Sequence, residues 1–71
     1  MATYHVPAGT PVGICRAREV GNWRKTWLSF RDYTTKKPLT FTGFEHFSGG
    51  TYIFKEGGWL LLVVRRYVTE S

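Results

Sequence analysis

Two glycine pairs, Gly49-Gly50 and Gly57-Gly58, divide the second half of the chain into short segments, and they constrain the fold more than any other feature. The flanking segments are rich in aromatic, β-branched and other apolar residues, which favour extended structure. Glycine pairs between such segments are typical of tight hairpin turns. Residues 39–46, 51–55 and 59–68 are therefore predicted to form three strands of an antiparallel meander.

The third of these strands begins with an uninterrupted apolar run, Trp59 to Val64. Such a run is typical of a central strand that is covered on both faces. Trp59 opens it, so we expect the indole ring to lie in the core and Trp59→Ala to unfold the protein. In the strand over residues 39–46, the alternation of side chains is interrupted at Gly43, which is a candidate bulge.

The first half of the chain is less regular. Residues 11–20 are predicted to form a strand, with Val12 and Ile14 facing inward and with Arg16 and Arg18 further along the same face. The segment before it, Gly9-Thr10-Pro11, is predicted to be a loop.

Residues 22–32 fit two periodicities. As a helix, they begin at an Asn22 N-cap and place an apolar stripe on one face, formed by Trp23, Trp27, Phe30 and Tyr33. As a strand, they place Trp23, Lys25 and Trp27 on an outer face that continues to Arg31 and Tyr33. The strand is preferred, because Trp, Thr, Phe and Tyr favour extended structure and the neighbouring segments are strands.

The chain of 71 residues is short enough to be one domain, so residues 1–71 are interpreted as a single small basic β domain. The fold class is expected to be mainly β. The first expectation is a small antiparallel barrel of five or six strands, SH3-like or OB-like, because closure removes exposed sheet edges. The alternative is a twisted antiparallel sheet with one short helix at about residues 22–32.

Cys15 is the single cysteine, so no disulfide forms within the chain. A cytoplasmic location suits this composition. No signal peptide is expected at the N-terminus, and the longest apolar stretch is much shorter than the about 20 residues that a bilayer-spanning helix needs. We therefore expect no membrane association.

Residues that support catalysis or metal binding are scarce. Glu45 and His46 are adjacent, so on a strand they point to opposite faces. A structural zinc site needs four closely spaced ligands, whereas Cys15, His5 and His46 are scattered. We expect no catalytic site, no cofactor and no bound metal, and we expect Cys15 to be a buried apolar residue.

Basic residues interleaved with aromatic residues form the most distinctive pattern in the chain. Flat rings stack on nucleic-acid bases, and cations follow the phosphate backbone. The net charge of +5 supports an acidic partner. The predicted nucleic-acid-binding residues are Trp23, Lys25, Trp27, Arg31, Tyr33, Arg16, Arg18, Lys36 and Lys37.

These residues support two functional hypotheses. The first is a small cytoplasmic regulatory domain that binds RNA or DNA, single-stranded or duplex, through this face. The alternative is a non-catalytic modulator that docks on an acidic surface of a larger machine, such as a polymerase or a nuclease. The tryptophans also have a purely structural interpretation as core residues, with the cations simply exposed to solvent.

Overall fold

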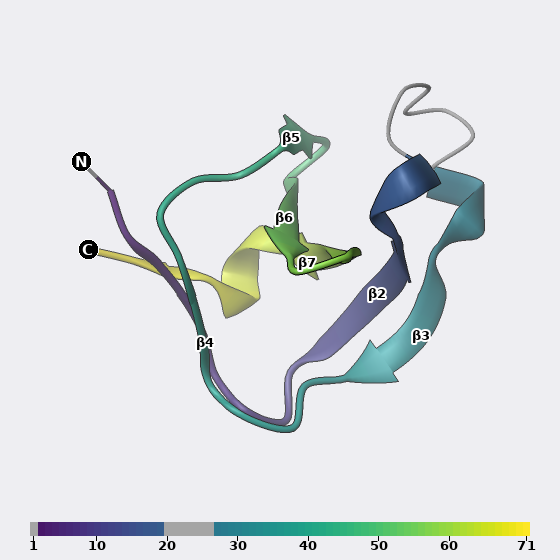
Figure 1. Cartoon of the computed structure of the whole chain (residues 1–71). Coiled ribbons are helices and arrows are strands. Elements are labelled where there is room, and N and C mark those ends of the chain that lie inside the picture. The colour runs from purple at the N-terminus through teal and green to yellow at the C-terminus, as the bar shows by residue number, and fades with distance from the viewer. Residues whose placement is uncertain (1, 20–26) are drawn as a thin grey trace.

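The computed structural model describes residues 2–19 and 27–71. The strands in these ranges are β1 (Tyr4–Val6), β2 (Pro11–Arg16), β3 (Arg31–Thr34), β4 (Leu39–Phe41), β5 (His46–Ser48), β6 (Thr51–Glu56), β7 (Trp59–Val64) and β8 (Thr69–Glu70). Two 3-10 turns, η1 (Ala17–Glu19) and η2 (Arg65–Tyr67), follow β2 and β7, and residues 27–29 are helical. The prediction of a mainly β chain is confirmed (Figure 1).

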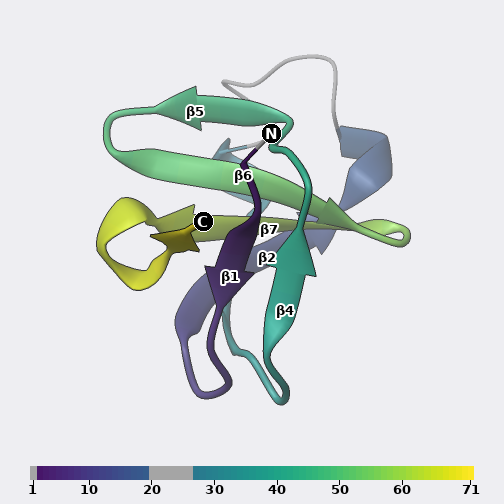
Figure 2. The same cartoon turned by 90° about the vertical axis from the view of Figure 1, so that its left-hand side faces the viewer.

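The strands form two antiparallel sheets. One has five strands in the order β3-β2-β7-β6-β5, and the other has three in the order β4-β1-β8. Figure 2 shows β1 and β4 running crosswise over one face of the larger sheet. Within the described residues, no strand pairing joins the two sheets into a closed barrel. The fold agrees with the alternative expectation, a twisted antiparallel sheet with one short helix, and the barrel is not confirmed.

The two predicted glycine hairpins are confirmed, and they join β5 to β6 and β6 to β7. The first strand of this meander is β5, His46–Ser48, and not the strand predicted over residues 39–46. Its two turns place Gly49, Gly50 and Gly57 at φ values of +58°, +78° and +60°, which side-chain-bearing residues rarely adopt. These turns fix the register, so that Ser48 lies opposite Thr51 and Glu56 lies opposite Trp59. The glycine pairs therefore determine which side chains of neighbouring strands lie on the same face of the sheet.

The larger sheet is covered on both faces. On its inner face, side chains of both sheets form one core cluster, in which the Phe41 and Phe54 rings are stacked 4.4 Å apart. On its outer face, Cys15, Ile53 and Leu60 form a second cluster, which Trp27 and Phe30 cover. The predictions of a doubly covered β7 and of a buried Cys15 are confirmed.

Three strand predictions are wrong in their extent. Residues 39–46 do not form one strand, because β4 joins the smaller sheet and β5 the larger one, and the chain crosses between them around Gly43. The strand predicted over residues 11–20 ends at Arg16, where η1 begins, so Arg18 lies beyond it. The strand predicted over residues 59–68 ends at Val64, before η2.

The preferred strand over residues 22–32 is wrong at residues 27–29, which are helical, although a strand does begin at Arg31. The helical alternative agrees with residues 27–29. Phe30 and Trp27 lie with their ring centroids 6.2 Å apart and both cover the second cluster, so burial of these two rings favours the helical turn over an extended strand. Residues 20–26 lie outside the described residues.

Because of Tyr4, the stability of the fold is expected to depend on pH in the alkaline range. Burial in the inner core raises the pKa of the Tyr4 phenol above its ordinary value of 10.0, and nearby Glu70 and Tyr52 act in the same direction. The folded state therefore favours the neutral phenol. Its contribution to stability is complete below pH 10.0 and declines as the pH rises through the higher folded-state pKa.

We expect Tyr4→Phe to lose less stability than the native chain as the pH rises above 10.0. Urea unfolding followed by circular dichroism at several pH values measures this difference. Tyr33→Phe, on the exposed edge strand β3, is the matched control for the loss of one phenol hydroxyl. Parallel profiles for Tyr4→Phe and the native chain would contradict the expectation.

Candidate functional site

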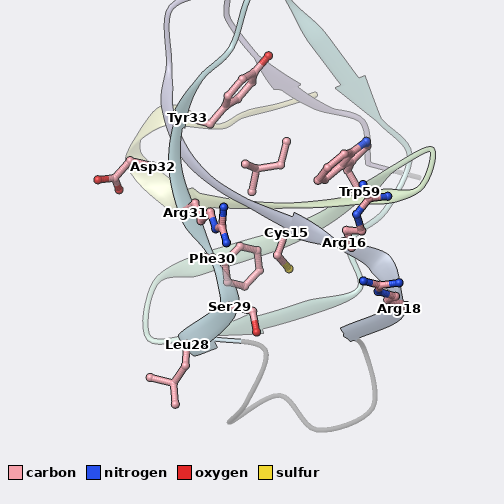
Figure 3. A pocket seen from close by; sticks show the side chains of 11 residues that line it. Cys15, Arg16, Arg18, Leu28, Ser29, Phe30, Arg31, Asp32, Tyr33 and Trp59 are labelled. Atoms are coloured by element: carbon pink, nitrogen blue, oxygen red, sulfur yellow. The ribbon is translucent and has the colours of Figure 1, made fainter.

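An open cleft of about 970 Å³ lies where β3 separates from β2. The two strands pair as far as Ile14 and Arg31. Beyond that point, Cys15, Arg16 and Arg18 line the cleft from one segment and residues 28–30 line it from the other. Trp59, at the start of β7, contributes to the lining from the neighbouring strand. Figure 3 shows the lining side chains.

Strand register places one cation directly beside the Trp59 ring. Arg16 pairs with Trp59 across β2 and β7, and its guanidinium carbon lies 4.8 Å from the ring centroid. Planar guanidinium groups are attracted to the faces of indole rings. Trp59 as a residue remains 41% exposed, so Arg16 and Trp59 form a cationic and aromatic pair that a ligand can reach.

The opposite side of the cleft comes from β3, the edge strand whose four residues are all exposed. Arg31 pairs with Ile14 and Tyr33 pairs with Val12, so alternation puts Arg31 and Tyr33 on the same sheet face as Arg16. The prediction that Arg31 and Tyr33 share a face with each other is confirmed. The predicted outer face shared with Trp27 is wrong, because their partners Ile14 and Val12 lie on the inner face and Trp27 covers the outer one. Arg18 also lines the cleft, from η1.

Lys36 and Lys37 follow β3 and line a second pocket beside the cleft. The Lys36 ammonium lies 5.7 Å from the Tyr33 ring centroid. Buried Thr35 anchors this segment, because its hydroxyl donates a hydrogen bond to the carbonyl of Pro7 over 2.8 Å and accepts one from the Thr10 amide over 2.9 Å. The two lysines therefore extend from a fixed backbone.

The tryptophans of the predicted interface behave differently from the expectation. Trp27 packs against the second core cluster, with its ring centroid 6.2 Å from those of Phe30 and His46. It does not line the cleft, so the structure does not bring it together with the predicted cations. Trp23 and Lys25 lie outside the described residues.

The sequence did not predict Trp59 as a residue of the site, although it is the most exposed aromatic residue in the cleft. Its predicted burial is wrong, because β7 extends past the edge of the smaller sheet, and Trp59 lies two residues beyond buried Leu61 on the same strand face. The missed signal is the position directly after the Gly57-Gly58 turn, since the first residue of a hairpin strand lies at the end of a sheet. Its pairing with Arg16 could not be found this way, because that contact is nonlocal.

Two further observations concern metal binding and membrane-spanning helices. Among residues 2–19 and 27–71, no three His, Cys, Asp or Glu side chains are grouped so that they could hold a metal ion. In the part of the chain that the structure describes, no helix has the length and apolar character needed to cross a bilayer.

Comparison with known proteins finds no matching family model, no matching curated protein and no matching solved structure.

Proposed function

We propose that this chain is a small, non-catalytic, regulatory nucleic-acid-binding domain of the cytoplasm and that the cleft is its interface. The observation that carries the proposal is the convergence of three arginines, Arg16, Arg18 and Arg31, with two exposed aromatic rings in one cleft. The planar guanidinium group of arginine can donate two parallel hydrogen bonds to one phosphate, and aromatic rings stack on bases.

The charge of the whole chain supports the same proposal. A net charge of +5 and an isoelectric point of about 9.8 attract polyanions from a distance. One carboxylate, Asp32, also lines the cleft, but in Figure 3 it points away from the labelled arginines and rings.

The two sheets packed on one core also support an open version of the small SH3-like or OB-like barrel, whose exposed sheet end carries the cleft.

A salt titration with a charge-matched pair of variants tests this function. Removal of two phosphate contacts by Arg16→Gln with Arg31→Gln is expected to weaken binding to RNA or DNA about tenfold at low salt, and to reduce the slope of log K against log salt by about 1 per lost contact. Fluorescence anisotropy of labelled single-stranded and duplex oligonucleotides measures both quantities.

The control is Arg65→Gln with Arg66→Gln, which removes the same charge from η2, at the opposite end of β7 from Trp59 (Figure 2). This control should lose much less affinity than the cleft variant. Equal losses in the two variants would mean that only net charge matters. Absence of binding to RNA, single-stranded DNA and duplex DNA at low salt would contradict the proposal.

The second hypothesis, a modulator that docks on an acidic protein surface, is favoured by one observation. β3 is an edge strand of the larger sheet with all four residues exposed, so a partner can add a strand beside it. A pull-down with and without nuclease separates the hypotheses. A partner retained after nuclease treatment, and released by Arg16→Gln with Arg31→Gln, would favour protein docking over nucleic-acid binding.

A further inference from the structure

The pocket beside the cleft has a volume of about 240 Å³ and shares Ile14, Tyr33 and Trp59 with the cleft. Leu39 of β4 and Leu61 of β7 add apolar surface from the two sheets. The pocket therefore opens where the smaller sheet stops covering the inner face of the larger one. It is continuous with the cationic cleft but has a more apolar lining.

The lining favours a flat aromatic ligand. Tyr33 and Trp59 supply two partly exposed rings, and each has a cation near its face, Lys36 over Tyr33 and Arg16 over Trp59. The volume is below the range of about 300–1,000 Å³ that is typical of pockets for drug-sized molecules. A single ring system suits this space. Lys36 and Lys37 in the lining and Arg16 beside Trp59 can pair with negative charges attached to that ring system, and they outnumber the one carboxylate in the lining, Glu56.

We infer that this pocket takes one unpaired base of a single-stranded nucleic acid, while the adjoining phosphates lie along Arg16, Arg31 and Lys36. This inference rests on the proposed nucleic-acid-binding function and narrows it to one substrate class. The base contacts the rings of Trp59 and Tyr33, and the backbone leads from the pocket into the cleft.

Duplexes fit this lining poorly. Paired bases are already stacked on their neighbours, and extruding one costs a few kcal/mol of pairing and stacking energy. Single strands present their ring faces without that cost, and stacking on aromatic side chains tolerates different base sequences. We therefore expect the pocket to prefer single strands over duplexes and to discriminate only weakly between base sequences.

Three probes of equal length, about eight nucleotides, test the inference. They are a single strand, prepared as DNA and as RNA, a sugar-phosphate strand of the same length without bases, and a duplex. Fluorescence anisotropy should show the single strand binding about tenfold more tightly than the abasic strand and more tightly than the duplex. Trp59→Ala should reduce the advantage over the abasic strand to less than about threefold.

Tyr33→Ala, on the exposed edge strand, is a second variant that should reduce the same ratio, and circular dichroism checks that both variants fold. Phe47→Ala removes a comparably exposed ring from β5, outside the pocket, and should preserve the ratio. Three results would each overturn the inference and leave the proposed function intact. They are equal binding of the base-containing and abasic strands, tighter binding of the duplex, and an unchanged ratio in folded Trp59→Ala and Tyr33→Ala. Failure to bind any of the probes would overturn the proposed function itself.

Discussion

Replacement of Phe54 with alanine is expected to leave the protein largely unfolded at room temperature. Phe54 is fully buried between the two sheets, and its ring stacks on Phe41 and lies 5.7 Å from Tyr4 and 5.4 Å from Tyr52. Truncating such a ring costs about 3–5 kcal/mol. A domain of this size has a total stability of about 3–5 kcal/mol, so the loss is comparable to the whole free energy of unfolding.

Circular dichroism and urea unfolding measure this effect. Phe47→Ala is the matched control, because Phe47 lies on edge strand β5 with 40% of its surface exposed. This control should remain folded and lose less than about 1 kcal/mol. If Phe54→Ala melts like the native chain, the contact between the two sheets does not provide the main stability of the fold.

Substitution of Gly13 by valine is expected to destabilise the protein by about 1–3 kcal/mol through overpacking. Gly13 lies in the middle of β2, where a side chain would meet the Cβ atoms of Phe30 at 3.1 Å and of Leu62 at 3.2 Å. Both neighbours are Cβ atoms, which cannot move aside by a change of rotamer. The residues that cover the outer face, Phe30 among them, would have to move away from β2 as a group.

Gly43→Val is the control for this substitution, since a side chain at Gly43 would meet nothing within 4 Å and its φ is not in the left-handed region. The comparison of the two urea midpoints isolates crowding from the general effect of replacing glycine. A Gly13→Val protein as stable as Gly43→Val would mean that the segment over residues 27–30 does not pack closely on β2. The same result would mean that this segment does not form a rigid side of the cleft.

The parts of the fold that could be predicted from the sequence are those set by local signals. Glycine pairs at 49–50 and 57–58 require a backbone that few other residues adopt, so both hairpin turns and the strands β6 and β7 follow from the sequence. The split of residues 39–46 could not be predicted, because Leu39 and Phe41 alternate in the same way whether or not the chain then changes sheets. Sheet membership is decided by distant partners.

The candidate site divides in the same way. Arg31 and Tyr33 were predictable as neighbours on one face, because alternation along a strand is local. Trp59 was predicted wrongly, because its exposure depends on where a second sheet ends. Its partner Arg16 is 43 positions away in the sequence and is brought beside it only by the pairing of β2 with β7.

The position of β1 in the smaller sheet has a consequence for the order of folding. β1 pairs only with β4 and β8, so Tyr4 lies opposite Phe41 and Glu70. In contrast, β5 with β6 and β6 with β7 form hairpins of consecutive strands, although β7 also pairs with the distant β2. Forming the hairpins closes loops of a few residues, but seating β1 closes loops of more than thirty, which is entropically slower. We therefore expect the meander to form early and β1 to dock late. Until β1 docks, Phe54 and Leu61 on the inner face lack part of their cover, so we expect the chain to be most prone to aggregate before this step.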